Sequence, residues 1–486
     1  MIRQLTSLDA QFLAIEDDRQ CGHVGSLAVY DPSTTPTGTL TVEHVRELVA
    51  ARLPLVPPLS WRLAEVPLGL DYPYWVHAEP DLEFHVREIA LPAPGSDAQL
   101  ARQVARLHSR RLDRAHPLWE LYVVSGLPEG RVGLYSKIHH AVIDGVSGAE
   151  VLGMLLDLSP EVAPTPPQAA PQLDPHPGAP ALVARAAYGA VRHPFRRLRA
   201  VPATIAHLDE STLAGLPLVA RVGRAAGRVD RLLHRDPERP VRPSQTAPAT
   251  PFTGRLTPDR AFAFGQIDLD RVKAVKAAYG VTVNDVVVSL CAGAVRQWLV
   301  EHDALPDSPL VAQVPVSVRT PEQSMTYGNR ILMLGASLHT QHDDPVQRLR
   351  ATSTDLTVMK TRHKALPADL LADVNHFIPP ALFNRAARLA LRLGAQGVVA
   401  PTWNLVVSNV PGPQFDLYMA GARLLATYPV SAITDSMGLN ITVMSYRGHL
   451  DVGVLADRAV MPDVDRIVEW MGTELAHLER LAPAAA

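Results

Sequence analysis

The sequence predicts an α/β (α+β) protein with two lobes, each a mixed β-sheet flanked by helices. Its 486 residues are too many for one ordinary domain, since a domain has roughly 150 residues. Strand-like and helix-like patterns are interspersed in both halves, which favours sheets covered by helices. Proline-rich stretches separate the halves. We therefore predict a first lobe at 1–159, a linker at 160–252 and a second lobe at 253–486.

The composition is that of a globular protein without a strong charge bias. Hydrophobic residues make up 47% of the chain and charged residues 20%, which is enough for two cores. The net charge of −3 gives no overall attraction to nucleic acid, so we expect no nucleic-acid partner. Two cysteines cannot form a disulfide framework, and no secretory signal or membrane span is evident. A reducing cytoplasm is the expected location.

The first lobe should contain a hairpin that ends in a histidine pair. Runs of β-branched and aromatic residues bounded by turn residues indicate strands, and apolar residues at helical spacing indicate helices. The expected elements are strands at 25–30, 119–124 and 131–138 and helices at 42–53 and 99–112. Pro128 and Gly130 mark the hairpin turn, and the second hairpin strand leads directly into His139 and His140.

The predicted linker contains an arginine-rich stretch between two proline-rich ends. Residues 159–180 and 235–251 are linker-like in composition, whereas 181–233 have a helical pattern with many arginines and few acids. This stretch fits a solvated helical connector between the lobes. It also fits a basic amphipathic surface that rests on a lipid interface.

The second lobe should also mix strands with helices. A helix at 269–279 ends at Gly280, and a longer apolar helix follows at 282–301. Three further helical stretches are expected before residue 393. The remaining expected elements are strands at 310–318, 331–338, 403–407, 439–445 and 449–455 and a closing helix at 463–481.

The strongest chemical signal is the run from His139 to Gly145, which reads HHAVIDG. Neighbouring side chains on a strand point to opposite faces, so only one histidine can face a given cleft. A capping-box pattern at 147–150 places the run between a strand end and a helix start. In such a loop, neutral His140 can take a proton from an alcohol, while Asp144 orients the ring or fixes the loop through an arginine. The glycine that closes the run allows a sharp turn.

Other interpretations of this run have less support. Single histidines usually serve structure, and histidine with aspartate can also bind a metal. No second motif supplies further ligands at metal-binding spacing, so we expect no metal. The chain also lacks a Gly-x-Ser-x-Gly elbow, a phosphate-binding loop and a dinucleotide fingerprint. A serine nucleophile or a redox cofactor therefore lacks its usual signal.

The histidine run resembles the HHxxxDG motif of the coenzyme A-dependent acyltransferases, which include chloramphenicol acetyltransferase and the condensation domains of peptide synthetases. Further landmarks resemble, in family order, the bacterial wax ester synthase/diacylglycerol acyltransferase family. They are Ser7–Leu13 with Glu16, His23–Gly25, Pro117–Trp119, Val283–Asp285, Val314–Arg319, Gly328–Asn329, Ser408–Pro413, Leu417–Ala422 and Gly438–Thr442. The histidine motif alone indicates only the superfamily, whereas the ordered set is specific.

This resemblance implies two chloramphenicol-acetyltransferase-like lobes with an active-site tunnel between them. Acyl-coenzyme A would be a substrate rather than a cofactor, and the other substrate would be a lipid alcohol. His140 would deprotonate the alcohol, which would attack the thioester directly without an acyl-enzyme intermediate. His139 would support the scaffold, and Glu16 and Gly145 would support the substrate or the loop. Asp144 would be structural, and Arg319 is its candidate partner across the lobe interface.

Four polar residues of the second lobe are further candidates, and each has a structural alternative. Asn284 and Asp285 fall in the first turn of a predicted helix, where the backbone alone favours both residue types. Asn284 would otherwise face the tunnel and hold the His140 loop or the thioester oxygen. Ser408 and Asn409 either form a turn at a strand end or contact substrate.

The resemblance favours transfer of a fatty acyl group from acyl-coenzyme A to diacylglycerol, which makes triacylglycerol. A long-chain fatty alcohol, which gives a wax ester, is the alternative acceptor. A non-catalytic protein that binds lipid droplets is a second alternative, but the intact histidine motif argues against it. Peripheral contact with a membrane or droplet, through the arginine-rich stretch 181–233, is compatible with each role.

Overall fold

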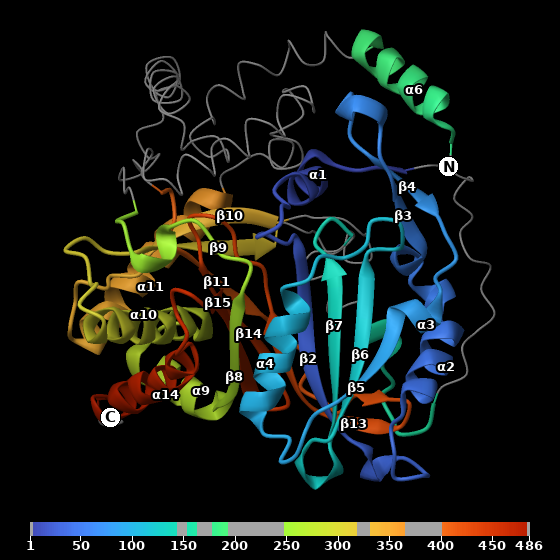
Figure 1. The fold of residues 1–486 in the computed structure, drawn as a ribbon. Helices are drawn as coiled ribbons and strands as arrows, with labels where there is room; N and C mark the ends of the chain where they lie inside the picture. The colour runs from blue at the N-terminus through green and yellow to red at the C-terminus, as the bar shows by residue number, and fades with distance from the viewer. Residues whose placement is uncertain are drawn as a thin grey trace.

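Two six-stranded mixed sheets lie side by side at the centre of the molecule (Figure 1). The computed structural model describes residues 3–142, 153–162, 177–192, 247–317, 331–364 and 401–483. Helices pack against both sheets, and a small third sheet adjoins the first. The predicted α/β architecture of two mixed-sheet lobes is confirmed.

The first sheet carries the histidine pair. Its strands are β2 (His23–Asp31), β5 (Val86–Ala90), β6 (Trp119–Ser125), β7 (Val132–His139), β12 (Tyr418–Met419) and β13 (Ala422–Val430). They follow the order β12-β13-β2-β7-β6-β5, and only the β5–β6 pair is parallel. The flanking helices are α2 (Val42–Arg52), α3 (Leu82–His85) and α4 (Asp97–His108). The register of β2 and β7 places His23 opposite His139.

Two strands of the first sheet come from the distant end of the sequence. β13 pairs antiparallel with β2, from Arg423 opposite Asp31 to Val430 opposite Gly25. The prediction that 253–486 form a lobe of their own therefore does not hold for residues 418–430. This crossover covers an edge of β2 that would otherwise leave its backbone groups unpaired.

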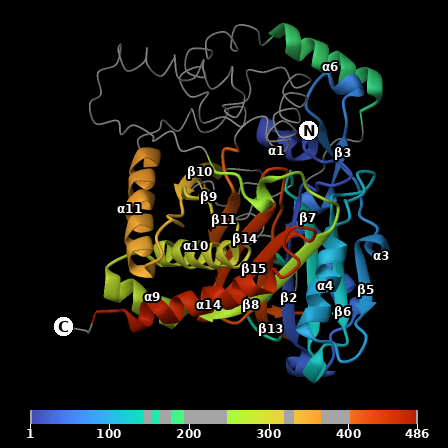
Figure 2. The ribbon, with the colours of Figure 1, turned by 60° about the vertical axis from the view of Figure 1, so that its left-hand side comes forward.

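The second sheet is built entirely from the later half of the chain. Its strands are β8 (Arg260–Asp268), β9 (Val311–Ser317), β10 (Ile331–Ser337), β11 (Leu405–Val410), β14 (Leu439–Tyr446) and β15 (His449–Asp457). Their order is β10-β9-β11-β14-β15-β8, and β11 runs parallel to both of its neighbours. The helices of this half are α9 (Leu269–Tyr279), α10 (Val283–Glu301), α11 (Pro345–Lys364) and α14 (Asp465–Arg480) (Figure 2).

Helix α10 forms the core of this second half. Among the described residues it is the one helix long and apolar enough to cross a membrane, with a mean hydropathy of 1.2. However, 72% of its apolar window is buried, and it packs against α9, α11 and α14. These contacts are those of a core helix.

The third sheet and helix α6 form an outlying layer. The sheet consists of β1 (Arg3–Gln4), β3 (Trp61–Ala64) and β4 (Tyr74–His77) in the order β1-β4-β3. Helix α6 (Ala179–Arg192) buries Leu182 and Ala186 against this layer (Figure 1). It is the part of the arginine-rich stretch 181–233 that the structure describes, and residues 193–233 lie outside the described ranges.

The two halves share a continuous apolar interface. Leu100 and Val104 of α4 belong to the same buried cluster as Phe262 of β8 and Leu455 of β15. The sheets also approach each other directly, because a Cβ atom on Gly453 would overlap the carbonyl oxygen of Pro429. The relative position of the halves is thus fixed by packing as well as by the crossover strands.

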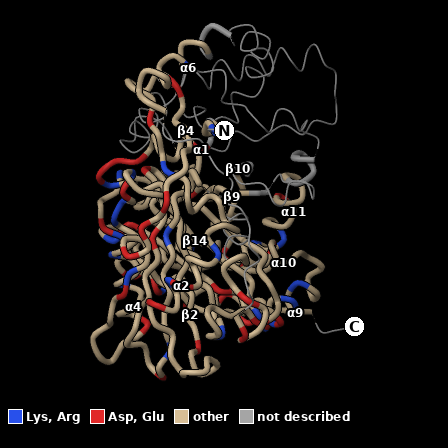
Figure 3. Tube along the Cα trace, turned by 90° about the vertical axis from the view of Figure 1, so that its right-hand side faces the viewer, with Lys and Arg blue, Asp and Glu red and all other residues tan. Residues whose placement is uncertain are grey.

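Charges and thiols in the described residues are unremarkable for a folded domain. Figure 3 shows basic and acidic residues interspersed along the chain. Cys21 and Cys291 are free and buried, and burial raises the pKa of the Cys21 thiol to about 11 and that of Cys291 to about 12. Both thiols are therefore protonated and poorly reactive.

Candidate active site

Strand β7 ends at the histidine pair. The amide of His139 donates to Leu118 O at 2.9 Å, and the amide of Val142 donates to His139 O at 2.9 Å, which closes a turn. The predicted position of the pair at a strand end is confirmed. Asp144, Gly145 and Arg319 lie outside the described residues, so their proposed pairing stays a prediction.

Both ring nitrogens of His139 are engaged by the protein. The amide of Ala141 donates to Nδ1 at 3.0 Å, so Nδ1 accepts and the neutral ring carries its proton on Nε2. Nε2 lies 3.2 Å from Oε1 of Glu16. The His139 side chain is only 1% exposed. A ring held in this way suits a scaffold role better than proton exchange with a substrate.

Glu16, which follows helix α1 (Ser7–Ala14), is the carboxylate behind this ring. Its Oε1 also accepts the amide of Gly22 at 2.9 Å, and its Oε2 accepts Nη2 of Arg114 at 2.9 Å. Burial alone would raise the pKa of Glu16, but His139, Gly22 and Arg114 together lower it from 4.5 to about 2. The carboxylate is therefore ionised and holds the pair from behind.

His140 is held by its backbone and by the face of its ring. Its amide donates to Gly22 O at 2.8 Å. Its imidazole stacks on Phe12 of α1, with ring centroids 4.0 Å apart and planes 7° from parallel. The side chain is half-buried, whereas His139 is fully buried. The two histidines thus have different surroundings, as expected for adjacent residues at a strand end.

Three residues of this arrangement were not predicted as site residues. They are Phe12, Gly22 and Arg114. The signal for Phe12 and Gly22 was their place in or beside the landmarks around Glu16 and His23. Arg114 had no distinguishing sequence signal, because it is one arginine among many.

Other buried histidines beside β7 are structural. His23 Nε2 lies 2.7 Å from His108 O, and His108 Nδ1 lies 2.7 Å from the Tyr135 hydroxyl. Burial lowers the pKa of His23 well below its ordinary value, and burial with the nearby Lys137 lowers that of His108 to about 3. Both rings stay neutral and are enclosed by the interface between the halves.

The candidate residues of the second half separate into two kinds. Asn409 Nδ2 donates to Asn284 Oδ1 at 3.3 Å, which joins the end of β11 to the start of α10. Asp285 instead caps α10: its Oδ2 accepts the amide of Thr282 at 3.0 Å and the hydroxyl of Ser353 at 2.9 Å. The structural alternative therefore accounts for the contacts of Asp285.

Ser408 and Asn409 lie within β11 rather than in a turn. The strand continues to Val410, and Ser408 pairs with Thr442 of β14. The expected strand-end turn is therefore wrong for these two residues. Both side chains are half-buried. Within the described ranges, no group of three or more His, Cys, Asp or Glu side chains could hold a metal ion.

Solved structures with the same fold define the class of protein. The first condensation domain of the calcium-dependent antibiotic synthetase matches with a TM-score of 0.57 and 18% identity, over 100% of this chain and 98% of that one. The wax ester synthase/diacylglycerol acyltransferase of Marinobacter aquaeolei VT8 matches with a TM-score of 0.69 and 29% identity, over 99% of both chains. The fold is the two-lobed one that these structures share, and the second of them is an acyltransferase.

Sequence matches identify the family. Residues 5–287 match the wax ester synthase/diacylglycerol acyltransferase catalytic domain, and residues 327–479 match the C-terminal domain of the same family. A Mycobacterium tuberculosis protein named as a diacylglycerol O-acyltransferase is 37% identical over 98% of this chain and 90% of its own. The O-acyltransferase WSD of Acinetobacter baylyi is 32% identical over 98% and 97%. The chain belongs to the wax ester synthase/diacylglycerol acyltransferase family and is an acyltransferase.

Proposed function

We propose that this acyltransferase moves a fatty acyl group from acyl-coenzyme A to the free hydroxyl of diacylglycerol, with His140 as the general base. The observation that carries this proposal is the contrast within the histidine pair. His139 is fully buried with both nitrogens engaged, whereas His140 is half-buried with its backbone and ring plane held. A held and half-buried imidazole suits proton transfer near neutral pH.

The proposed reaction needs no cofactor and no covalent enzyme intermediate. His140 takes the hydroxyl proton as the alcohol oxygen attacks the thioester carbonyl. The new C–O bond forms, the C–S bond breaks, and the histidinium returns its proton to the departing thiolate. The products are triacylglycerol and free coenzyme A. Asp144, paired with Arg319, would hold the turn that follows.

The Asn284–Asn409 pair is the proposed second-half contribution to the site. Its amide groups join α10 to β11 and provide further donors and acceptors beside one another. We propose that the pair lines the tunnel between the lobes, where an amide N–H can stabilise negative charge on the thioester oxygen. Ser408 shares the same strand end and is the weaker candidate for substrate contact.

A fatty alcohol is the second candidate acceptor. The matched family is named for both wax ester synthesis and diacylglycerol acylation, and the Marinobacter relative carries both names. Both acceptors present a primary or secondary hydroxyl to the same base, so the mechanism is unchanged. The difference would lie in the walls of the acceptor site.

The deciding assay combines purified protein, labelled acyl-coenzyme A and either diacylglycerol or hexadecanol. We expect ester formation that falls roughly 100- to 10,000-fold in His140→Ala, the usual worth of a positioned base. His108→Gln, a change at a buried structural histidine, is the matched control. Full activity in His140→Ala would disprove the proposed mechanism. Absence of ester from either alcohol would favour a non-catalytic lipid-binding role.

We also propose that the protein meets its lipid substrate at the apolar tip of the β3–β4 hairpin. Leu68 is 89% exposed and Leu70 49% exposed at this tip, and Tyr188 on the adjoining α6 is 61% exposed. Arg185 lies on the same helix. Exposed apolar side chains next to a basic residue fit an anionic lipid surface.

This surface can be tested with vesicles that contain anionic phospholipid. We expect the wild type to bind them and the double variant Leu68→Asp/Leu70→Asp to bind several-fold more weakly. Leu481→Asp is the matched control, because Leu481 is also 49% exposed but directly follows α14, a helix on the opposite side of the molecule from α6 (Figure 1). Equal binding by both variants would disprove the proposed role of the hairpin tip in binding lipid.

A further inference from the structure

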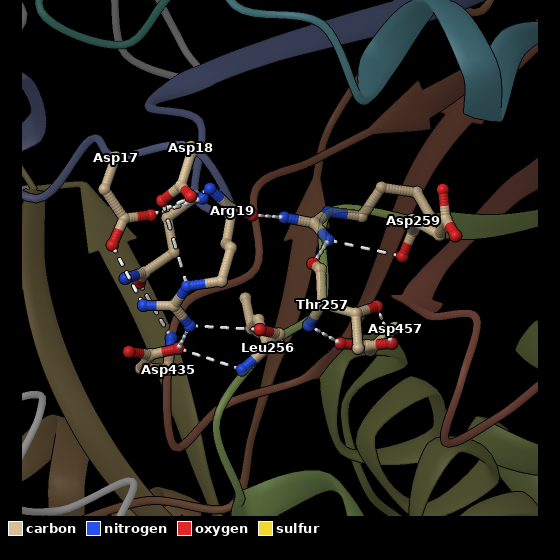
Figure 4. Close-up of polar contacts among 10 residues, drawn as sticks. Asp17, Asp18, Arg19, Leu256, Thr257, Asp259, Asp435 and Asp457 are labelled. Atoms are coloured by element: carbon tan, nitrogen blue, oxygen red, sulfur yellow. Dashed lines mark hydrogen bonds and ion pairs between the residues drawn. The ribbon is translucent and has the colours of Figure 1, made fainter.

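Arg19 connects the two halves of the molecule from the loop between α1 and β2 (Figure 4). Its Nη1 donates to Leu256 O at 3.0 Å and to Asp435 Oδ1 at 3.3 Å. Its Nη2 donates to Asp17 of its own loop at 3.0 Å. Asp435 lies in the segment that returns from β13 in the first sheet to β14 in the second. One guanidinium therefore spans the lobe interface.

Residues of the second half also form hydrogen bonds with the backbone of Arg19 and with the side chain of Gln20. Arg260 donates to the carbonyl oxygen of Arg19, and the amide of Asp435 donates to Oε1 of Gln20 at 2.9 Å. The carboxylate of Asp435 is in turn fixed by the amide of Leu256 at 2.9 Å. Figure 4 shows this group of contacts between residues 17–19 and the segments around 256 and 435.

The same loop ends at Gly22, the residue that accepts the backbone amide of His140. Gly22, three residues after Arg19, accepts the His140 amide at 2.8 Å and donates its own amide to Glu16 at 2.9 Å. The backbone of Gly22 is tightly packed against its neighbours. A Cβ on Gly22 would lie 2.6 Å from Phe12 O and 2.9 Å from His139 Nε2. A displacement of Arg19 would therefore be passed to the histidine turn.

We propose that Arg19 is a positioning residue, which couples the docking of the second half to the placement of the base His140. The inference rests on the proposed role of His140. When the Asp435 and Leu256 contacts are made, the loop holds Gly22 where it receives the His140 amide. When they are broken, the fold persists but the base is displaced from the acceptor hydroxyl.

Burial explains why this contact is sensitive to substitution. The side chain of Arg19 is 12% exposed and that of Asp435 1% exposed. Removal of Arg19 alone leaves a buried carboxylate without its cation, which destabilises the interface. A shortened but charged side chain, or removal of both charges together, avoids that penalty. These variants separate positioning from simple loss of stability.

The test compares Arg19→Met, Arg19→Lys and Arg19→Met/Asp435→Asn in the full chain. Arg271→Met is the matched control, because its ion pair with Glu479 lies within the second half alone. For each, kcat, KM for acyl-coenzyme A, the pH profile of kcat and the thermal midpoint are measured. Misplacement of a catalytic group by about 1 Å can cost 100-fold, so we expect Arg19→Met to lower kcat roughly 10- to 100-fold.

The expected pattern is a fall in kcat with KM changed less than about threefold, a displaced pH profile and partial recovery in Arg19→Lys. Arg271→Met should match the wild type. A normal kcat and pH profile in Arg19→Met would overturn the proposal, as would a loss fully accounted for by unfolded protein. If Arg19→Met does not fold, the charge-neutral double variant is judged by the same criteria. His140→Ala, assayed in parallel, shows separately whether the base assignment itself fails.

Discussion

Nε2 of His139 lies 3.2 Å from Oε1 of Glu16, and both side chains are almost fully buried. This contact joins the end of β7 to the loop after α1, far apart in the sequence. It fixes the tautomer of His139, because Nδ1 is already occupied by the Ala141 amide. The base next to it therefore follows a buried neighbour whose ring is held by the Ala141 amide on one side and by the Glu16 carboxylate on the other.

Glu16→Gln tests whether the stability of the protein depends on this buried carboxylate. The glutamine keeps the size of the side chain but replaces one acceptor oxygen with a donor, which faces donors from Gly22, Arg114 or His139. We expect the free energy of unfolding to fall by about 1–3 kcal/mol at neutral pH. Denaturant titration measures it. Glu65→Gln, at the exposed second partner of Arg114, is the control and should change stability little.

The lowered pKa of Glu16 predicts how the stability of the protein changes in acid. The pKa of Glu16 is lowered from 4.5 to about 2, so its contribution to stability is full above pH 4.5 and is lost as the pH falls through 2. The stability difference between wild type and Glu16→Gln should therefore be constant from pH 7 to 5 and should shrink below pH 4.5. A difference that grows on acidification would contradict this assignment.

Asp451 is expected to affect stability with the opposite dependence on pH. It is fully buried at the lobe interface, where its carboxylate accepts the Thr427 amide at 2.7 Å and the Gln266 amide group at 2.8 Å. Burial raises its pKa from 3.8 to about 6 despite these bonds. A raised pKa in an acid means that the folded state holds the proton more tightly than the unfolded state. Its stabilising contribution is therefore present below pH 3.8 and is lost as the pH rises through 6.

Asp451→Asn should remove this loss, because the amide stays neutral and can still accept from Thr427. Relative to wild type, we expect near-equal stability at pH 4 and a gain of about 1–3 kcal/mol at pH 8. Unfolding midpoints at the two pH values measure it. Asp268→Asn, at an exposed helix cap, should show no such gain on raising the pH. Parallel stability curves for wild type and Asp451→Asn would rule out a titrating Asp451.

The sequence alone was sufficient to predict those helices and strands whose bounds are set by residues within the element. Helix α9 matches its predicted bounds, and the β6–β7 hairpin was predicted to within one residue at each end. In each case the pattern of apolar residues and the bounding turn residues lie within the element itself. The position of the histidine pair at the end of β7 followed from the same kind of information.

The sequence was not sufficient where the structure depends on distant partners. Strand β13 contains Pro429, which disfavours a strand assignment, yet its pairing with β2 completes the first sheet. The contacts of His139 with Glu16 and of Asn284 with Asn409 join segments more than a hundred residues apart. Each residue was predicted as a candidate, but its partner is specified only by the topology.

Phe12 tests the importance of ring placement at the base. Its ring lies parallel to His140 at 4.0 Å and blocks rotation of the imidazole on one side. Phe12→Ala should lower kcat roughly 10-fold, within the range expected for a loosened catalytic group, and leave KM for acyl-coenzyme A little changed. Phe84→Ala is the matched control, because Phe84 stacks in the same way on His116, which is neither of the paired histidines. Equal losses in both variants would argue against a specific role for Phe12.

Gly453 tests the closeness of the two sheets. A Cβ at this position would overlap the carbonyl oxygen of Pro429, which is backbone and cannot move aside without separating β15 from β13. Gly453→Ala should therefore lower the free energy of unfolding by about 1–3 kcal/mol or more, as overpacking in a core does. Gly472→Ala provides the contrast, because Gly472 lies in helix α14 with open space around it. Alanine favours a helix over glycine by about 1 kcal/mol, so this variant should be equally or more stable than the wild type. If Gly453→Ala proved as stable as Gly472→Ala, the sheets would not be in the direct contact that fixes the halves together.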